Sequence, residues 1–320
     1  MKIVHVNNTA GVAKFLCTEL RRKKHEVRLF TKTAVSVVYA YPEEWVSTLK
    51  NAYDAATLRK IDQSHPDIIH CHYLLNKVTF LTALLHRNKP IIYHAHGSDT
   101  RAKSLFLRLM RKILLRKAKH LLYSTPDLKY NLSWFRGDKI FLPNPIQVPE
   151  YMPYEPLYKE RILIYGTLYR LKKIDQILDL VSTLPYHFDI IDWGPDREYF
   201  SKRFPSNVTP VPVVKHADVS NFLRKYPLVI GASWDGTIRM SELDAMALGV
   251  PTLFPFKYNQ AYMKPLPMPE LTAKAIQAHI GDFELGRQQR AWVKEFHSVE
   301  VVVEKLLAIY QKVLLEALCS

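Results

Sequence analysis

The chain has 320 residues, of which 48% are hydrophobic and 23% charged, a composition typical of a globular protein with about two domains. These values exclude a disordered chain, a collagen-like repeat and a disulfide scaffold. Three cysteines with no CxxC pair indicate a reducing compartment and argue against a structural zinc ribbon. The first apolar run, Lys2–Val6, is too short for a signal peptide or a membrane span, so we expect a cytoplasmic protein.

The net charge of +15 is unevenly distributed. Residues 1–150 hold 25 Lys and Arg against 11 Asp and Glu, whereas residues 151–320 hold 20 against 19. Residues 101–119 alone contain eight basic residues and no acidic one. Such an asymmetry indicates that the first half meets an anionic partner, such as nucleic acid, a phospholipid surface or a phosphorylated substrate.

Short apolar runs alternate with segments of helical periodicity along the first half of the chain, the pattern of a parallel sheet with helices on both faces. The predicted strands are Lys2–Val6, Val27–Phe30, Asp67–His70, Ile91–His94, His120–Tyr123 and Ile140–Leu142. The predicted helices are Gly11–Lys23, Lys77–His86, Arg101–Lys117 and Asp127–Leu132. These elements predict one doubly wound domain.

Five prolines within residues 142–156 make that segment stiff and mark a linker. After it the alternation restarts, with strands at Ile162–Tyr165, Phe188–Asp192, Val208–Val214, Leu228–Gly231 and Thr252–Phe254. The helices of this half are expected at Lys173–Ser182, Asp196–Phe204, Asp218–Tyr226, Ser241–Leu248, Glu270–His279 and Ser298–Leu318. We therefore expect an N-terminal Rossmann-like domain (1–146), a Pro-rich linker (147–158), a C-terminal Rossmann-like domain (159–297) and a C-terminal helix (298–320) that packs back on the first domain.

Two Rossmann-like domains joined by a short linker form a cleft, and open parallel sheets bind ligands beyond the carboxyl ends of their strands. We therefore expect the active site between the domains. The sequence contains neither GxGxxG nor GxxxxGK[ST], which disfavours a nicotinamide dinucleotide site and a P-loop.

Histidines gather at two predicted strand ends. His70 and His72 end one strand, and His94 and His96 end the next, so each pair shares a face of its strand. The four could form a metal cluster, but no carboxylate stands at a spacing that completes the ligand set. Hydrogen bonding to a substrate is the favoured role, and we expect no metal.

Basic residues and glycines coincide at two predicted strand-to-helix turns in the second half. One turn follows Gly166 and carries Arg170, Lys172 and Lys173. Cations at a helix N-terminus oppose the helix dipole, so a bound anion would explain them. The second turn, around Gly236, places Thr237 and Arg239 before a helix that contains Asp244. Backbone N–H groups with Arg239 suit a diphosphate, and Asp244 suits ribose hydroxyls.

Three of these segments resemble motifs of the retaining glycosyltransferases of GT-B fold, family 4. DAMALGVP (Asp244 to Pro251) is similar to the family's E-A-M-A-x-G-x-P, and GTLYRLKK (Gly166 to Lys173) to its G-R-L-x-x-x-K-G. HGSD (His96 to Asp99) resembles the histidine loop of its N-terminal domain. STPDL, LPNPI and DWGPD are weaker matches, and the order of the segments agrees over nearly the whole chain.

The resemblance implies a UDP-, GDP- or ADP-sugar held mainly by the C-terminal domain, an acceptor held by the N-terminal domain, retention at the anomeric carbon and no required metal or other cofactor. It places Lys172 on the diphosphate lysine and His96 beside the donor sugar. The implied catalytic residues are His96, Lys172, Arg170 and Arg239. The implied donor-binding residues are Gly11, Gly166, Thr167, Asp235, Gly236, Thr237, Ile238 and Asp244, and the implied acceptor or sugar contacts are Ser98 and Asp99.

The chain departs from the family pattern at two positions. The family's diphosphate arginine falls on Thr167, so that Arg170 or Arg239 must replace it. The first glutamate of the E-x7-E pair falls on Gly236, with Asp235 one position away. A non-catalytic GT-B subunit or regulator that binds a sugar nucleotide is therefore the alternative to an active hexosyltransferase.

The basic segment 101–119 indicates the kind of acceptor. Leu105, Leu109, Ile113 and Leu114 are predicted to pack on the sheet, and Arg108, Arg111, Lys112 and Arg116 to face an anionic membrane. Aromatic residues do not interleave with the basic ones, which argues against nucleic acid. We therefore expect sugar transfer to a lipid-linked or other membrane-associated acceptor, by an enzyme at the cytoplasmic face of the membrane.

Overall fold

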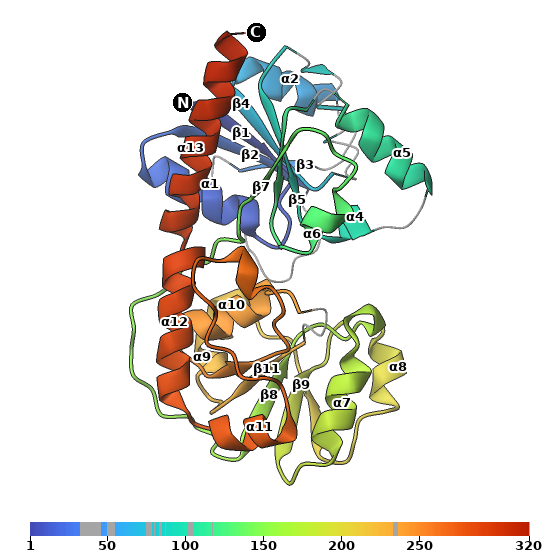
Figure 1. Cartoon of the computed structure of the whole chain (residues 1–320), viewed down its shortest axis with the longest axis vertical. Helices are drawn as coiled ribbons and strands as arrows, with labels where there is room; N and C mark the ends of the chain where they lie inside the picture. Colours follow the sequence, from blue (N-terminus) through green and yellow to red (C-terminus); the bar gives the residue numbers. More distant parts are fainter. Residues whose placement is uncertain are drawn as a thin grey trace. The chain divides into compact units, whose positions relative to one another are not determined.

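The computed structural model describes residues 1–32, 46–49, 55–74, 79, 81–82, 85–86, 88–101, 105–116, 118–232 and 236–319. The chain forms two compact units, each built around its own parallel sheet (Figure 1). Unit 1 comprises Met1–Pro145 and Val299–Ser320, and unit 2 comprises Ile146–Ser298. The α/β fold class expected from the alternating pattern is confirmed.

The sheet of unit 1 has the strand order β3-β2-β1-β4-β5-β6-β7, and all of its pairings are parallel. Its strands are β1 (Lys2–Val6), β2 (Glu26–Lys32), β3 (Val46–Leu49), β4 (Ile68–His72), β5 (Ile91–Ala95), β6 (His120–Tyr123) and β7 (Asp138–Phe141). Six were predicted from the sequence, and β3 was missed. The strand order reverses at the β1/β4 pair, which fixes the place where ligands bind in such sheets.

The two faces of this sheet differ in chemistry. Val4, Ile69 and Tyr93 point to one face and join an apolar core with Leu114 and Leu121. Because side chains alternate along a strand, the intervening histidines of β1, β4 and β5 point to the opposite face. That face is covered by α1 (Val12–Arg22) and α13 (Val299–Leu318), which pack against each other (Figure 1).

The remaining helices of unit 1 are short: α2 (Ala55–Gln63), α4 (Ser98–Arg101), α5 (Leu105–Leu114) and α6 (Leu128–Asn131). The single helix predicted for residues 101–117 is wrong, because α4 ends at Arg101 and a separate α5 begins at Leu105. The sequence pattern gave no signal for α2. Half of the helix predicted at 77–86 lies outside the described residues.

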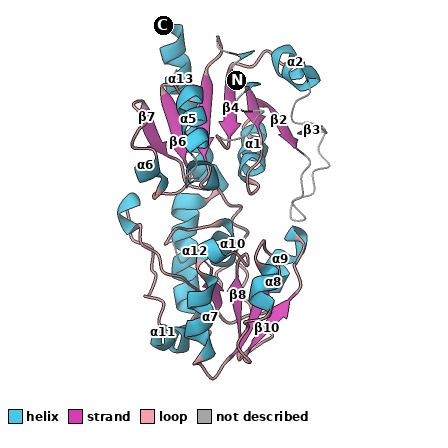
Figure 2. Cartoon of the chain, turned by 90° about the vertical axis from the view of Figure 1, so that its right-hand side faces the viewer, coloured by secondary structure: helices cyan, strands magenta, loops and turns pink. Residues whose placement is uncertain are grey.

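Unit 2 repeats the architecture with the strand order β10-β9-β8-β11-β12, again parallel (Figure 2). Its strands are β8 (Arg161–Tyr165), β9 (His187–Ile191), β10 (Val208–Val211), β11 (Val229–Gly231) and β12 (Thr252–Leu253). Its helices are α7 (Ile174–Ser182), α8 (Arg197–Ser201), α9 (Val219–Leu223), α10 (Met240–Ala247), α11 (Ala273–His279) and α12 (Phe283–His297), with 3₁₀ turns at Arg170–Lys172, His216–Asp218 and Asn259–Ala261. Helix α12 was not predicted.

The Pro-rich segment after residue 145 is fastened to unit 2. Ile146 pairs with Ser298, the residue at which the chain leaves this unit. Arg290 donates a hydrogen bond to the Pro149 carbonyl at 2.6 Å, and Tyr154 packs edge-on against Phe283. The segment 147–158 is therefore a strap along unit 2 rather than a free linker (Figure 1).

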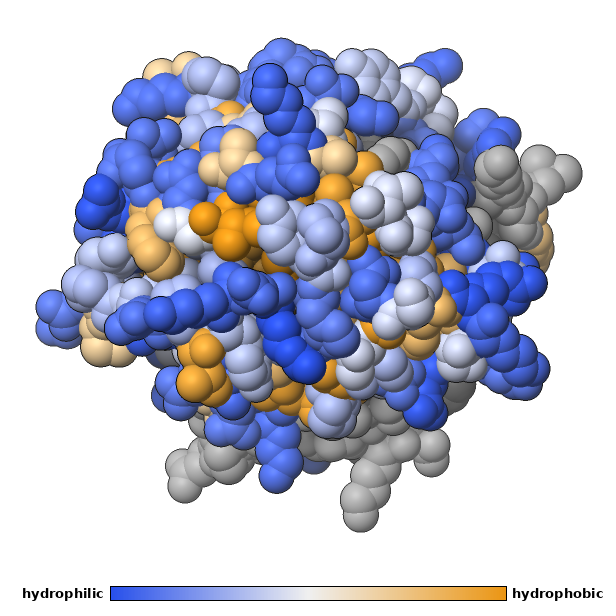
Figure 3. Space-filling view, turned by 90° about the horizontal axis from the view of Figure 1, so that it is seen from below, coloured by the Kyte–Doolittle hydropathy of each residue, from blue (hydrophilic) through white to orange (hydrophobic). Residues whose placement is uncertain are grey.

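None of the described helices is long and apolar enough to cross a membrane. On the face drawn in Figure 3, apolar atoms are exposed in small areas between hydrophilic side chains.

Candidate functional site

Each unit has one point at which its strand order reverses, and the loops at these two points carry most of the predicted site residues. In unit 2 the point lies between β8 and β11. In unit 1 it lies between β1 and β4.

The loops after β8 and β11 touch so closely that only glycine fits at Gly166. A Cβ there would lie 2.2 Å from the Cβ of Ala232. The Gly166 loop is also held from the other side, because the N–H of Leu168 donates to the Trp193 carbonyl and the Asp196 carboxylate accepts from the N–H of Arg170. Gly166 therefore allows the two loops to pack closely together.

The side chains of the basic residues near Gly166 point in different directions. Arg170 is 60% exposed, pairs with Asp196 at 3.3 Å and lies over the ring of Tyr199, so it points toward the loop after β9. Lys172 is half-buried in the 3₁₀ turn that ends at the left-handed residue Lys173. Arg239, by contrast, donates from Nη1 to the Ala232 carbonyl at 3.3 Å, next to Gly166. Of the two arginines predicted to compensate for Thr167, Arg239 is the one at the β8/β11 point.

The N-terminus of α10 is tightly built around Glu242. The buried Glu242 carboxylate accepts from the N–H of Arg239, the N-cap residue, and from the Ser241 hydroxyl. Thr237 and Ile238 are buried, so their side chains shape the loop rather than face a donor. Gly236 adopts φ +81°, and a Cβ there would lie 2.6 Å from the stem of Lys257.

Lys257 is a candidate donor-binding residue that the sequence did not indicate. It is exposed, follows β12, and its N–H donates to the Gly236 carbonyl. Together with Arg239 and Lys172 it gives the loops of unit 2 three cations. Asp235 and the loop residues before it lie outside the described residues.

Asp244, the predicted ribose-binding residue, lines a pocket of about 220 Å³ within unit 2. The pocket is lined by Ile146, Gln147, Pro149, Val219, Ser220, Asp244, Ala247 and Leu248. Burial raises the pKa of Asp244 to about 7, and the charge of Glu242 adds to the effect. A partly buried carboxylate in a largely apolar pocket is stabilised by hydroxyl donors, which agrees with the predicted role.

Strained backbone angles occur at the β1/β4 point of unit 1, which corresponds to the β8/β11 point of unit 2. Asn7, Ala10 and Tyr73 adopt positive φ angles of 71°, 50° and 71°, and Gly11 adopts 77° as the N-cap of α1. Non-glycine residues rarely adopt such angles, and they concentrate at functional sites. The Asn7 amide donates to the His72 carbonyl at 3.1 Å, so the loops after β1 and β4 are joined.

The HGSD loop after β5 is held by its own acidic residue, which corrects one prediction. The carboxylate of Asp99 is buried and accepts from the N–H groups of Leu74, His96 and Gly97 at 2.8–3.3 Å. It therefore fixes the loop instead of contacting an acceptor or sugar. Ser98 is the first residue of α4.

Arg111 also differs from its prediction. It is 3% exposed and donates from Nη1 to the carbonyls of Asp99 and Thr100, so it anchors the loop and does not face a membrane. The sequence predicted an exposed Arg111 because its charge was the only signal. The carbonyls that bury and bind it belong to a loop outside α5. The other three, Arg108, Lys112 and Arg116, are exposed.

The exposed face of α5 also carries apolar side chains. Phe106, Leu109 and Ile113 are 68%, 56% and 54% exposed and recur at helical spacing. Leu109 and Ile113 were predicted to pack on the sheet, which is wrong, whereas the same prediction for Leu114 is confirmed and Leu115 joins it in the core.

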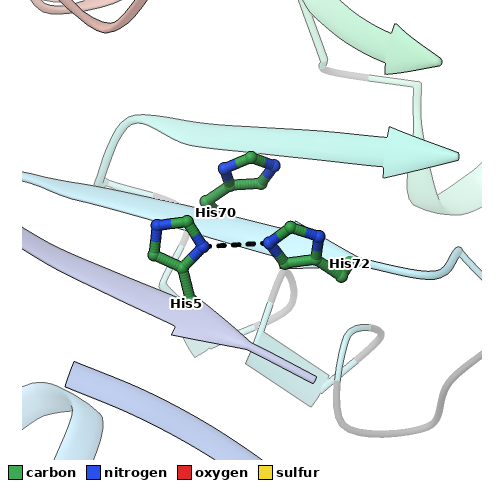
Figure 4. Close-up of side chains that lie close together, drawn as sticks. All are labelled: His5, His70 and His72. Carbon is green, nitrogen blue, oxygen red and sulfur yellow. Dashed lines mark hydrogen bonds between the residues drawn. The ribbon is translucent and has the colours of Figure 1, made fainter. Parts of the chain in front are cut away.

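Five histidines meet on the α13 side of the unit 1 sheet: His5, His70, His72, His94 and His96. Three of them are joined in series by hydrogen bonds. His5 Nδ1 and His72 Nε2 are 2.9 Å apart (Figure 4), and His72 Nδ1 and His96 Nε2 are 3.0 Å apart. The Tyr310 hydroxyl of α13 contacts His70 at 2.7 Å and His5 at 3.2 Å. The sequence placed four of these histidines on adjacent strands but missed His5 and Tyr310.

Burial keeps these imidazoles neutral at pH 7. It lowers the pKa of His5 and of His96 to about 3, and it lowers the pKa of His70, His72 and His94 well below the usual range. Both ring nitrogens of His94 are buried without a hydrogen-bond partner among the described residues. An unpaired buried N–H costs about 1–3 kcal/mol. Two triads, His5/His70/His72 and His72/His94/His96, have nitrogens within 4.8 Å of one another and could hold a metal ion.

This architecture defines the GT-B fold, and solved structures of that fold match almost the whole chain. Sucrose-phosphate synthase from Thermosynechococcus elongatus is 15% identical, with a TM-score of 0.75 over 98% of this chain and 99% of that one. Anabaena HepE in complex with UDP is 14% identical, with a TM-score of 0.72 over 98% and 100%. Staphylococcus aureus TarM, solved with fondaparinux, α-GlcNAc-glycerol and UDP, is 14% identical, with a TM-score of 0.60 over 80% and 58%.

A family model matches part of the sequence. Residues 10–148, almost all of them in unit 1, match the model of glycosyltransferase family 4, and no curated protein matches the chain. This match and the GT-B structures support the resemblance to the family 4 glycosyltransferases that the motifs indicated.

Proposed function

We propose that this protein is a retaining glycosyltransferase that moves a hexose from a nucleotide-diphosphate sugar to a lipid-linked or other membrane-associated acceptor, without a required metal. The observation that carries the proposal is the β8/β11 point of unit 2, where Arg239 lies at the Gly166/Ala232 contact, Lys257 approaches Gly236, and Lys172 belongs to the Gly166 loop. Fixed positive charge and backbone N–H groups stabilise a diphosphate as it leaves the sugar. The UDP bound in HepE and in TarM supports a nucleotide in the same fold.

The roles divide between the units. Lys172 and Arg239 neutralise the leaving diphosphate, and Lys257 joins them from the loop after β12. Asp244 accepts hydrogen bonds from ribose hydroxyls in its pocket. In unit 1, the neutral His96 offers a hydrogen-bonding group to the donor sugar, and Asp99 with Arg111 keeps its loop in place. The first-loop Gly11 lets the N-terminus of α1 approach the phosphates.

The exposed face of α5 supports a membrane-associated acceptor. Phe106, Leu109 and Ile113 form an apolar stripe beside three exposed cations, Arg108, Lys112 and Arg116. A helix with this make-up lies in a headgroup interface, where each basic residue near an anionic leaflet contributes roughly 1 kcal/mol. We therefore place the enzyme at the cytoplasmic face of the membrane.

A thermal-shift panel of nucleotide sugars tests the proposal. A ligand present at 100 times its Kd stabilises the folded protein by about 2.7 kcal/mol, which shifts the melting temperature by several degrees. One nucleotide sugar should stabilise the protein, and the shift should be lost in Arg239→Ala. A panel with no shift for any nucleotide sugar or nucleoside diphosphate would contradict the donor site. A shift without turnover would favour the non-catalytic subunit instead.

A further inference from the structure

We infer that His72, His94 and His96 form a binding site for one Zn²⁺ ion in unit 1, with an open coordination position on the side of His96. This site shares His96 with the proposed sugar transfer, which requires no metal, so its test measures metal binding and not activity. It rests on the convergence of three histidines, on the unpaired ring of His94 and on the hydrogen-bonded residues behind His72.

The first step of the argument is ligand geometry. β4 and β5 are paired in register, with His72 opposite His94, and His96 follows at the end of β5 on the same face. Three imidazole nitrogens lie within 4.8 Å of one another, and one pair, His72 Nδ1 and His96 Nε2, is already 3.0 Å apart. Tetrahedral Zn²⁺ with bonds of about 2.0–2.1 Å holds nitrogens about 3.3 Å apart, so small side-chain rotations suffice.

The second step is the state of His94. Its two ring nitrogens are buried and make no hydrogen bond within the described part of the chain, whereas His72 and His96 have partners. A buried polar ring with no partner requires an explanation, and a bound metal ion supplies one.

The third step is the outer shell. Metal-binding histidines almost always hydrogen-bond through their second nitrogen, which fixes the ring orientation. His72 does so: its Nε2 lies 2.9 Å from His5 Nδ1 (Figure 4), and His5 Nε2 in turn lies 3.2 Å from the Tyr310 hydroxyl. In the fully buried His5/His70/His72 triad, His5 uses both ring nitrogens and His70 uses Nδ1 in these bonds. Only His70 Nε2 is left unpaired within the described residues, so this triad serves as the support rather than the site.

The fourth step is access. His72 and His94 are fully buried, but His96 is partly exposed, so an ion can enter from its side. Three histidines leave one position of a tetrahedral ion open to water or another oxygen ligand, as in catalytic rather than structural zinc sites.

Zinc titration of the tag-free, EDTA-treated and desalted full chain tests the inference, with a chromogenic chelator as competitor. We expect one Zn²⁺ per chain. His96→Ala and His94→Ala should each abolish stoichiometric binding, while the exposed His65→Ala, in the same unit, should bind as the native chain does. His5→Phe should weaken binding by about 10–100-fold, the usual effect of losing an outer-shell partner.

Circular dichroism and melting temperature separate loss of the site from loss of the fold. His96 is partly exposed, so His96→Ala keeps the inference testable even if His94→Ala does not fold. Absence of stoichiometric zinc in the native chain would overturn the inference. Undiminished binding in a folded His96→Ala variant would overturn it too.

Discussion

The two units place chemically opposite groups at equivalent points of similar sheets. At the β8/β11 point of unit 2, exposed or half-buried cations surround glycine-lined loops. At the β1/β4 point of unit 1, the side chains are histidines that burial keeps neutral. Fixed charge suits a ligand whose negative charge grows during the reaction, whereas neutral imidazoles suit hydroxyl groups. The two sheets therefore present different chemistry, with cations that suit a phosphate group in unit 2 and neutral rings that suit hydroxyl groups in unit 1.

The largest effect on kcat should come from removing a cation at the β8/β11 point of unit 2. Lys172→Ala should lower kcat at saturating donor by about 10²–10³-fold, because it removes one charge partner of the transition state. Lys173→Asn is the matched control: it removes the neighbouring exposed lysine, and asparagine tolerates the left-handed backbone at that position. An unchanged kcat in Lys172→Ala would remove the residue from the diphosphate site.

The arginine that replaces the missing family residue can be identified in the same assay. Arg239→Ala should cost about as much as Lys172→Ala, since its guanidinium lies beside Gly166. Arg170→Ala should cost less than tenfold, because that side chain points toward Asp196 and Tyr199. The reverse order of effects would assign the role to Arg170.

A second test concerns the exposed face of α5. Changing Arg108, Lys112 and Arg116 to Gln should weaken co-sedimentation with anionic vesicles at low salt by about 10–100-fold. Arg111 stays unchanged because it is structural. The control removes three exposed lysines of unit 2, Lys215, Lys225 and Lys274. Equal loss in the two variants, or no binding of the native chain, would leave a soluble acceptor as the better hypothesis.

Loss of the neutral imidazole of His96 in unit 1 should have a smaller effect on kcat. His96→Ala should lower kcat by about tenfold, the value of one hydrogen bond to the sugar, while circular dichroism stays unchanged. Since the pKa of His96 is near 3, the kcat of the native enzyme should show no titration of this residue between pH 5 and 8. If the kcat of His96→Ala equals that of the native enzyme, His96 does not contact the sugar.

The smallest expected effect is on stability. Because the pKa of Asp244 is raised from its ordinary value to about 7, the folded state disfavours its ionised form. Stability should therefore fall as pH rises from about 4 to 7. Asp244→Asn removes this penalty and should raise the melting temperature by about 2–4 °C at pH 8, with no gain at pH 4. An equal shift at both pH values would rule out the titration of Asp244 as its cause.

Local patterns made most of the fold predictable. Alternating apolar runs located eleven of the twelve strands, and the regular periodicity of residues 298–318 located α13. Helix α12 was missed because its buried positions include Gly286, Gln289 and His297, which dilute the apolar pattern. Strand β3 is four residues long and carried no comparable signal.

The site was predictable only in part, because roles depend on contacts between distant segments. The sequence identified the Gly166 loop and the histidine strands, which are local features. It could not show that the Asp99 carboxylate would be used by backbone N–H groups, or that Arg111 would be buried beneath the same loop. Lys257 was missed because its approach to Gly236 joins loops from two different strands.

Turnover of a nucleotide sugar by the purified protein in EDTA tests the central claim most directly. With the donor selected by the thermal-shift panel and a lipid-linked acceptor, the account predicts release of the nucleoside diphosphate and a product that retains the anomeric configuration. The double variant Lys172→Ala/Arg239→Ala should release none. Tight binding of the nucleotide sugar without any release would contradict the account, and release that needs added metal would contradict its metal-independent mechanism.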